Sequence, residues 1–196
     1  MDKEKVMNKI KILALFGESS SGKDYWQKQI VLHYKDKAHS IVSCTTRPPR
    51  DYEVNGVDYH FLTPDQFGEK VLNGDMLEAT SFRDWFYGTA LSSLDANKVN
   101  VGVFNPQGME CILEDPRLDV TPVYIYASPK VRLMRALERE ESPDCDEICR
   151  RYFTDKTDFE QMDNFDSFVY NNNPGKAKYQ LWDEYFVKQL FNEAEG

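Results

Sequence analysis

The feature that most constrains the fold of this chain is a short apolar segment that runs directly into a loop of small residues. Ile10–Phe16 (IKILALF) is almost continuously apolar, a pattern typical of a strand buried on both faces of a parallel sheet. The loop Gly17–Gly22 follows, and a helical pattern then extends from Asp24 to about His33. This order of strand, loop and helix begins an α/β pattern.

The rest of the chain continues the alternation, with one interruption. Short alternating segments between turns occupy residues 39–89 and predict a small antiparallel sheet inserted between βα units. Later segments return to buried strands and charged helices. The expected elements are strands at His39–Ser43, Val57–Phe61, Met76–Ser81, Trp85–Thr89, Val99–Phe104, Pro122–Ala127 and Ser167–Tyr170, a helical stretch from Pro129 to about Phe153 broken near Ser142-Pro143, and a final helix over Leu181–Leu190.

The first loop matches a phosphate-binding motif. GESSSGK has the spacing G-x-x-x-x-G-K, and it lies between a strand and a helix as that motif requires. The glycines allow backbone N–H groups to point at phosphate oxygens, and the helix adds its positive N-terminal end. Lys23 is expected to neutralise the β- and γ-phosphates of a nucleotide. The predicted nucleotide-binding residues are Gly17, Ser19, Ser20, Ser21, Gly22, Lys23 and Asp24.

Asp24 departs from the motif, which usually has Ser or Thr at this position to bind Mg²⁺ through a hydroxyl. A carboxylate is also a good hard ligand for this ion, so Asp24 is a candidate Mg²⁺ ligand. Without the metal, the same carboxylate would repel the phosphates.

A second motif follows about 25 residues later. Arg47 and Arg50 lie three apart in a loop stiffened by proline, and each guanidinium suits a phosphate monoester. The string that contains them, SCTTRPPRDYEVNGVDYHFLT, resembles the GMP-binding signature of the guanylate kinase family, and GESSSGKD stands where that family has its phosphate loop. The resemblance covers roughly residues 10–190.

The resemblance implies roles for individual residues. The GMP phosphate would be held by Arg47, Arg50, Tyr59 and Tyr87, and the base would be read by Ser43, Glu78, Thr89 and Asn105. Glu78 suits this role because guanine presents two adjacent donors, N1–H and the 2-amino group, to one carboxylate. The resemblance also implies that Arg135, Arg139 and Arg151 bridge the donor and acceptor phosphates. These three arginines would act in catalysis together with Lys23 and Arg47. Asn171 would lie near the adenine.

The implied architecture is a single domain over residues 1–196 with a parallel-sheet core flanked by helices. The core would comprise about 1–38, 90–129 and 154–196, with an inserted GMP-binding subdomain at 39–89 and a helical lid at 130–153. The implied reaction transfers a phosphoryl group from ATP, with Mg²⁺, to GMP or dGMP in cytoplasmic purine nucleotide metabolism.

Three positions depart from the family pattern and leave alternatives open. Val103 and Asn105 replace two aspartates, and Glu140 replaces the glycine after the lid arginine. Together with Asp24, the residues Val103 and Asn105 suggest a kinase of broader deoxynucleotide preference. A non-catalytic module that uses the GMP groove to bind a partner is the other alternative, although such modules tend to lose Lys23 and the lid arginines.

Composition limits the partners. The net charge of −9 and a pI near 4.9 argue against nucleic-acid binding. We expect no membrane span and no signal peptide, because the first apolar stretch is only about seven residues long. The four cysteines form no CxxC pair, which is typical of reduced cytoplasmic thiols rather than zinc ligands or disulfides. The pattern does not indicate an oligomeric state.

Overall fold

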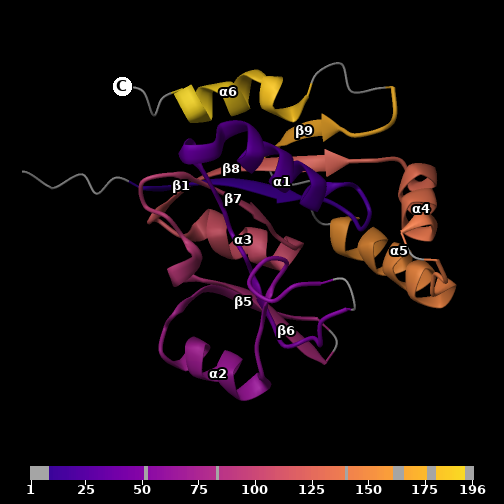
Figure 1. Cartoon of the computed structure of the whole chain (residues 1–196), viewed down its shortest axis with the longest axis horizontal. Helices are drawn as coiled ribbons and strands as arrows, with labels where there is room; N and C mark the ends of the chain where they lie inside the picture. The colour runs from indigo at the N-terminus through magenta and orange to yellow at the C-terminus, as the bar shows by residue number, and fades with distance from the viewer. Residues whose placement is uncertain are drawn as a thin grey trace, which may run out of the picture.

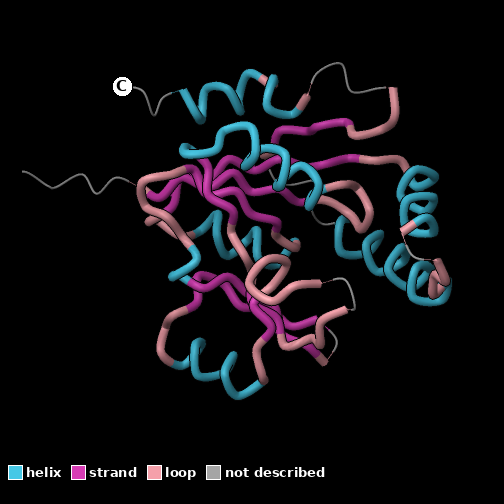
Figure 2. The backbone as a smooth tube through the Cα atoms, viewed as in Figure 1, coloured by secondary structure: helices cyan, strands magenta, loops and turns pink. Residues whose placement is uncertain are grey.

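The computed structural model describes residues 9–50, 53–82, 84–139, 141–160, 166–175 and 180–192. The larger of its two sheets has the strand order β2-β7-β1-β8-β9, and every pairing between its neighbours is parallel. Its strands are β1 Ile10–Phe16, β2 Ala38–Ser40, β7 Val99–Val103, β8 Leu118–Tyr126 and β9 Phe168–Asn171. The parallel core predicted from the sequence is therefore confirmed (Figures 1 and 2).

Helices cover both faces of β1, which explains why this strand is apolar at nearly every position. Successive side chains of a strand point to opposite faces. Leu13 and Leu15 pack in one buried cluster with α1 (Lys23–Tyr34) and α6 (Tyr185–Asn192). Ile12, Ala14 and Phe16 pack in a second cluster with Met109 and Ile112 of α3 (Pro106–Glu114). The central strand is thus held rigidly, and the loop that leaves its carboxyl end starts from a fixed point.

The second sheet has the order β4-β3-β6-β5, and the prediction that it is antiparallel is wrong for one pair. β3 (Cys44–Thr45) and β4 (His60–Phe61) are parallel, whereas β6 (Trp85–Ala90) is antiparallel to both β3 and β5 (Met76–Phe82). Parallel neighbours need a long connection. The segment 46–59 provides it, and the same segment carries the arginine motif.

The strand expected at 39–43 lies elsewhere. Ala38–Ser40 forms β2, which pairs with β7 in the larger sheet, so His39 belongs to the core sheet and not to the second one.

The helices α2 (Pro64–Leu72) and α3 were not predicted from the sequence. Each begins at a proline preceded by a capping residue. Thr63 and Gln66 form a complete capping box at α2, and the Asn105 side chain accepts a hydrogen bond from Gly108 N at 2.7 Å at α3. The Thr-Pro-x-Gln string is a recognisable helix start that could have identified α2.

The charged helical stretch divides into α4 (Pro129–Glu138) and α5 (Cys145–Glu160), which confirms the break predicted near Ser142-Pro143. Both lie beyond the carboxyl end of β8, beside the phosphate loop (Figure 1). The final helix is shorter than expected, because Leu181–Asp183 is a separate 3₁₀ turn before α6. In the part of the chain that the structure describes, Lys35–Lys37 and Leu91–Ser93 also form 3₁₀ turns. Within the described ranges, no helix has both the length and the apolar character of a membrane span.

Candidate functional site

The loop between β1 and α1 has a backbone that requires its glycines. Gly17 and Gly22 have φ values of 143° and 105°, which side chains rarely tolerate. A Cβ atom on Gly17 would lie 2.6 Å from the carbonyl oxygen of Ile125, and one on Gly22 would collide with the amide of Asn172. Ser20 also has a positive φ, 61°. The loop is therefore the compact, N–H-rich turn that the motif predicts.

Lys23 begins α1 and points back over the loop. Its Nζ donates to the Glu18 carbonyl oxygen at 2.9 Å. Burial lowers the pKa of Lys23, and the nearby carboxylates of Asp24 and Asp155 partly offset that effect. A phosphate bound here would favour the charged amine further.

Three residues that the sequence analysis did not select surround the loop. The guanidinium of Arg132, from α4, pairs with Asp155 at 2.8 Å and with Glu18. Asp155, from α5, accepts hydrogen bonds from Ser19 N at 2.8 Å and from Ser19 Oγ at 3.1 Å. Asn172, which follows β9, donates from Nδ2 to the Ser21 carbonyl oxygen at 2.6 Å. No local motif marks these residues, because they reach the loop only through the tertiary fold.

Arg135, from α4, contacts the phosphate loop. Its Nη1 donates to the Ser21 carbonyl oxygen at 3.0 Å, and its Nη2 donates to the Asn172 carbonyl oxygen at 2.9 Å. Beside it lies a cavity of about 420 Å³ lined by Trp26, Arg135, Asn172 and Asn173, among others.

Asn171 is not among the residues that line this cavity. Its Oδ1 accepts hydrogen bonds from the Asn173 backbone N at 3.1 Å and side-chain Nδ2 at 2.8 Å. The next residue, Asn172, contacts the phosphate loop instead. Asn172 and Asn173, and not Asn171, line the cavity beside Arg135.

A second cavity, of about 250 Å³, joins the phosphate loop to the smaller sheet. It brings together several predicted residues that lie far apart in the sequence: Lys23, Ser43, Tyr59, Glu78, Tyr87 and Asn105. Thr89 is fully buried, and it faces Glu78 across the β5–β6 pair. One open cavity thus contains Lys23, two phenols and the Glu78 carboxylate, and Asp155 and Asp158 of α5 also line it.

Glu78 is the most perturbed carboxylate of this cavity. The residue is only 9% exposed, and its burial raises the pKa of Glu78 to about 7, although contacts with Thr89 partly oppose the shift. A carboxyl group held near neutrality in a small polar cavity is a strong candidate for ligand recognition. Such a group gains most from a ligand that offers it hydrogen-bond donors.

The amide of Asn105 is already engaged within the protein. Its Oδ1 caps α3 through Gly108 N, and its Nδ2 donates to Thr80 Oγ1 at 2.9 Å. Val103 also lines the cavity but offers no acceptor. Glu78 is thus the carboxylate that the smaller sheet contributes to this cavity.

The arginine motif is held by Glu53. Arg47 Nη2 contacts Glu53 Oε1 at 2.8 Å, and the Arg47 guanidinium lies 5.6 Å from the centre of the Tyr59 ring. Glu53 Oε2 accepts a hydrogen bond from Arg50 N at 2.8 Å. These contacts fix the loop and orient both arginines.

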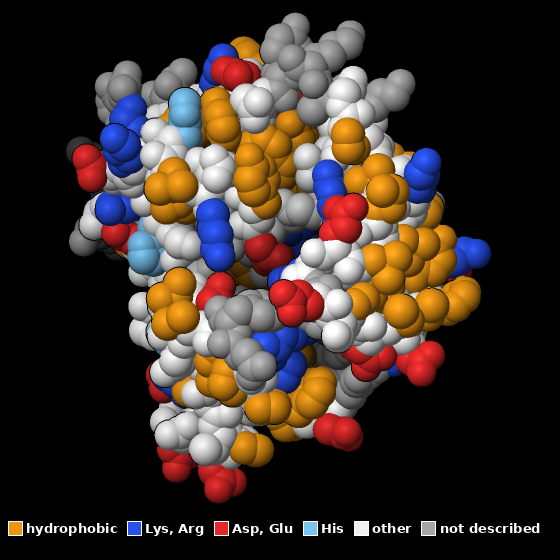
Figure 3. All heavy atoms as spheres, turned by 45° about the vertical axis from the view of Figure 1, so that its right-hand side comes forward, with side chains coloured by type: hydrophobic (Ala, Val, Ile, Leu, Met, Phe, Trp, Pro, Cys, Tyr) orange, Lys and Arg blue, Asp and Glu red, His pale blue; other side chains and the backbone are white. Residues whose placement is uncertain are grey.

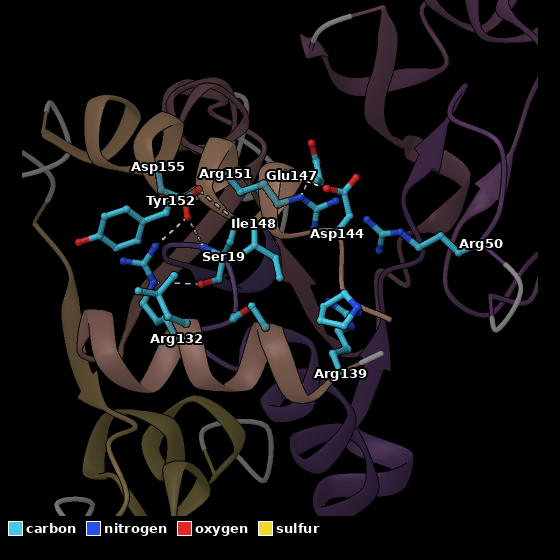
Figure 4. A pocket seen from close by; sticks show the side chains of 14 residues that line it. Ser19, Arg50, Arg132, Arg139, Asp144, Glu147, Ile148, Arg151, Tyr152 and Asp155 are labelled. Carbon is cyan, nitrogen blue, oxygen red and sulfur yellow. Dashed lines mark hydrogen bonds and ion pairs between the residues drawn. The ribbon is translucent and has the colours of Figure 1, made fainter. Parts of the chain in front are cut away.

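A central cleft of about 690 Å³ lies between the smaller sheet, the phosphate loop and the helices α4 and α5. Figure 3 shows charged side chains gathered around this hollow. The positively charged side chains that line it are Lys23, Lys28, Arg47, Arg50, Arg139, Arg150 and Arg151. In the close-up, Arg50 points toward the side where Arg139 and Arg151 lie (Figure 4). The same cleft is lined by carboxylates, namely Asp24, Glu53, Asp58, Glu147, Asp155 and Asp158, and some of these pair with its arginines, as Glu53 does with Arg47 and Glu147 with Arg150 and Arg151. A polyphosphate ligand would therefore compete with these carboxylates for the arginines.

Comparison with known proteins agrees with this geometry. The family model described as guanylate kinase matches residues 9–186. Among curated relatives, the guanylate kinase of Schizosaccharomyces pombe is 29% identical over 184 residues, which is 88% of this chain and 89% of that protein. The guanylate kinase of Sus scrofa is 28% identical and covers 86% of this chain and 88% of its own length. The guanylate kinase of Campylobacter jejuni strain RM1221 is 25% identical, and the match covers 82% of this chain and 80% of that protein.

A solved structure supports the fold. The guanylate kinase of Anaplasma phagocytophilum superposes with a TM-score of 0.57 at 19% sequence identity, covering 95% of this chain and 84% of that one. At this identity the similarity concerns the fold alone. The match of the family model over most of the chain decides the assignment. This chain belongs to the guanylate kinase family.

Proposed function

We propose that this protein transfers a phosphoryl group from ATP to GMP or dGMP. The observation that carries the proposal is the shared cavity, in which Lys23 of the phosphate loop faces the same space as Glu78, Tyr59 and Tyr87. Donor phosphates on the loop and an acceptor nucleotide in the cavity would meet in the central cleft. The reaction then needs no covalent intermediate, because positioning and charge stabilisation suffice for an in-line transfer.

The cations divide between the two substrates. Lys23 and Arg135 serve the donor side, because both contact the phosphate loop. Arg47 and Arg50 serve the acceptor phosphate from the loop that Glu53 fixes. Arg139 and Arg151 line the cleft between these sites and would stabilise the charge on the phosphoryl group during transfer.

Base recognition depends on Glu78. Its carboxylate would accept hydrogen bonds from the guanine N1–H and 2-amino group, whereas adenine offers no such pair of donors. AMP would leave the buried carboxylate unpaired, which is costly.

The pKa of Glu78 predicts a pH dependence of guanine binding. Guanine favours the ionised carboxylate, and protonation below pH 7 removes that form, so affinity should fall as the pH decreases. We expect binding about tenfold weaker at pH 6 than at pH 8. Calorimetric titration with guanosine measures this without interference from titration of the GMP phosphate. A flat profile would show that Glu78 does not hold the base.

We further propose that Asp24 holds Mg²⁺ together with the ATP phosphates. Asp24 is exposed in the first turn of α1 and lines the central cleft. Mg²⁺ is typically held by one or two carboxylates, substrate phosphates and water, so this single carboxylate fits the ion. When bound, Mg²⁺ would neutralise part of the donor phosphate charge.

Replacement of Asp24 by Ser should narrow the difference between ATP affinities measured with and without Mg²⁺. The wild-type carboxylate repels unmetallated phosphates, and the metal converts this repulsion into two attractions. We expect the ratio of the ATP dissociation constants measured without and with Mg²⁺ to be about tenfold smaller in the variant than in the wild type. The variant should retain part of its activity. Titration of ATP in EDTA and then in excess Mg²⁺ measures both values. An equal difference in the two proteins would mean that Asp24 only stabilises the helix N-terminus.

A coupled ADP-release assay tests the proposed function directly. ATP and Mg²⁺ would be supplied with GMP, dGMP, AMP, CMP, UMP or dTMP in turn. Turnover restricted to GMP and dGMP supports the proposal. Turnover of further monophosphates would favour a kinase of broader preference, in keeping with Val103 and the engaged amide of Asn105. No turnover with any of them would favour a non-catalytic binding module.

A further inference from the structure

A carboxylate from α5 occupies the phosphate loop. Asp155 Oδ2 accepts the backbone N–H of Ser19 at 2.8 Å, and Oδ1 accepts the Ser19 hydroxyl at 3.1 Å. Backbone N–H groups of this loop are the donors that a bound phosphate normally receives. Asp155 therefore makes, from 136 residues away, the type of contact expected of a phosphate oxygen.

Arg132 completes this contact. It is 3% exposed, and its Nη2 donates to the same Asp155 Oδ2 at 2.8 Å (Figure 4). Its other donors have partners of their own, since Nε donates to the Ser19 carbonyl oxygen at 3.0 Å and Nη1 pairs with Glu18. Arg132 would thus remain in place without Asp155, and only Nη2 would need a new acceptor.

We propose that Asp155 is an internal substitute for a phosphate group, and that ATP displaces it and takes over the hydrogen bonds of Ser19 N and Arg132 Nη2. The inference rests on the proposed function, because it concerns how ATP reaches the loop. Arg132 becomes an additional donor to the ATP phosphates. The contact of Asp155 with the loop competes with ATP and lowers its affinity. The helix that carries Arg151 would be released at the same moment, which couples donor binding to movement of the lid.

The physical reason is exclusion. One N–H group cannot serve a carboxylate and a phosphate at full strength, and the two anions repel each other at contact distance. The free protein must therefore break the Asp155 contact before ATP binds. The apparent dissociation constant for ATP equals the intrinsic constant divided by the fraction of free molecules in which Asp155 has left the loop.

The test compares ATP binding in the wild type with that in Asp155→Ala and Asp155→Asn. Calorimetric titration of ATP with Mg²⁺ should give about tenfold tighter binding for Asp155→Ala, as expected if the contact occupies about nine tenths of the free molecules. Asp155→Asn should fall between, since its amide oxygen can still accept from Ser19 N. Tripolyphosphate should show the same order, because the effect concerns phosphate and not adenine.

Asp158→Asn is the matched control. Asp158 lies three residues further along α5, faces the same cleft and, among the described residues, makes no hydrogen bond to the loop. The control removes one negative charge without removing the contact, and ATP affinity should change less than about twofold. An equal gain in both variants would reduce the effect to general electrostatics and overturn the inference.

Weaker ATP binding by Asp155→Ala would also overturn the inference, because it would show that Asp155 stabilises the ATP-bound loop. If the wild type binds ATP and turns over GMP while Asp155→Ala binds ATP with unchanged affinity, only this inference fails. If no form binds ATP, the proposed function fails with it. Circular dichroism of each variant confirms that the fold is retained.

Discussion

Lys23→Ala is expected to lower kcat for phosphoryl transfer by about a thousandfold or more, while the affinity for GMP stays within about twofold of the wild type. The amine lies above the phosphate loop and is held 2.9 Å from the Glu18 carbonyl oxygen. Its charge would stabilise the donor phosphates as charge moves during transfer. Alanine removes that charge and leaves the guanine-binding end of the cavity intact.

Single-turnover rates and GMP titrations of the variant measure the two quantities separately. Lys130→Ala is a suitable control, because Lys130 is an exposed lysine in the first turn of α4. A fall in GMP affinity with a preserved rate would reverse the assignment of donor and acceptor sites. A preserved rate alone would remove Lys23 from catalysis.

The second large effect is expected for Glu78→Gln, which should lower kcat/KM for GMP by about a thousandfold. A glutamine amide offers one acceptor and one donor group, so it cannot accept both guanine donors. One guanine N–H would then face the amide N–H₂. The assay panel measures the change in kcat/KM for GMP and for AMP. A loss confined to GMP supports base recognition, whereas equal losses for both substrates would indicate a structural defect.

The same substitution should stabilise the fold at neutral pH. The pKa of Glu78 rises from 4.5 to about 7 on folding, so its neutral form is favoured in the native protein. Stability associated with this group is fully present below pH 4.5 and is lost as the pH rises through 7. Glutamine does not ionise and avoids that loss. Above pH 7 the free energy of unfolding of the variant should therefore exceed that of the wild type by at most about 3 kcal/mol.

Thermal unfolding at pH 4.5, 6 and 8 measures this gain. The difference in Tm between Glu78→Gln and the wild type should be near zero at pH 4.5 and largest at pH 8. Glu69→Gln, on an exposed face of α2, should show no such trend. A constant difference at all three pH values would mean that Glu78 does not titrate between them.

The parts of the site that could be predicted are those written in contiguous residues. The phosphate loop and the Arg47–Arg50 loop are recognisable because local backbone geometry demands particular residues at fixed spacing. The parallel pairing of β3 with β4 was missed because it depends on how a long loop crosses over, which alternation does not reveal. Asp155 and Arg132 have no local signature at all. Their contacts with the phosphate loop exist only in the tertiary structure, where α4 and α5 pack beside it.

Asn105 illustrates a different limit. Its position was predicted to contribute an acceptor to the base, and it does line the cavity. Its amide, however, begins α3 and holds Thr80. A sequence motif identifies where a residue stands, but competition between hydrogen-bond partners determines what it can offer.

The place of β1 in the larger sheet has a consequence for protein synthesis. This apolar strand pairs on its two sides with β7 and β8, which end at Val103 and Tyr126. At a synthesis rate of about 5–20 residues per second, roughly 5–20 s pass between the appearance of β1 and that of its second neighbour. IKILALF lacks both partner strands until β7 has been made, and it lacks β8 until the end of this interval. The segment that later supports the phosphate loop is therefore an apolar stretch of the nascent chain that stays prone to non-native association until β8 covers its second edge.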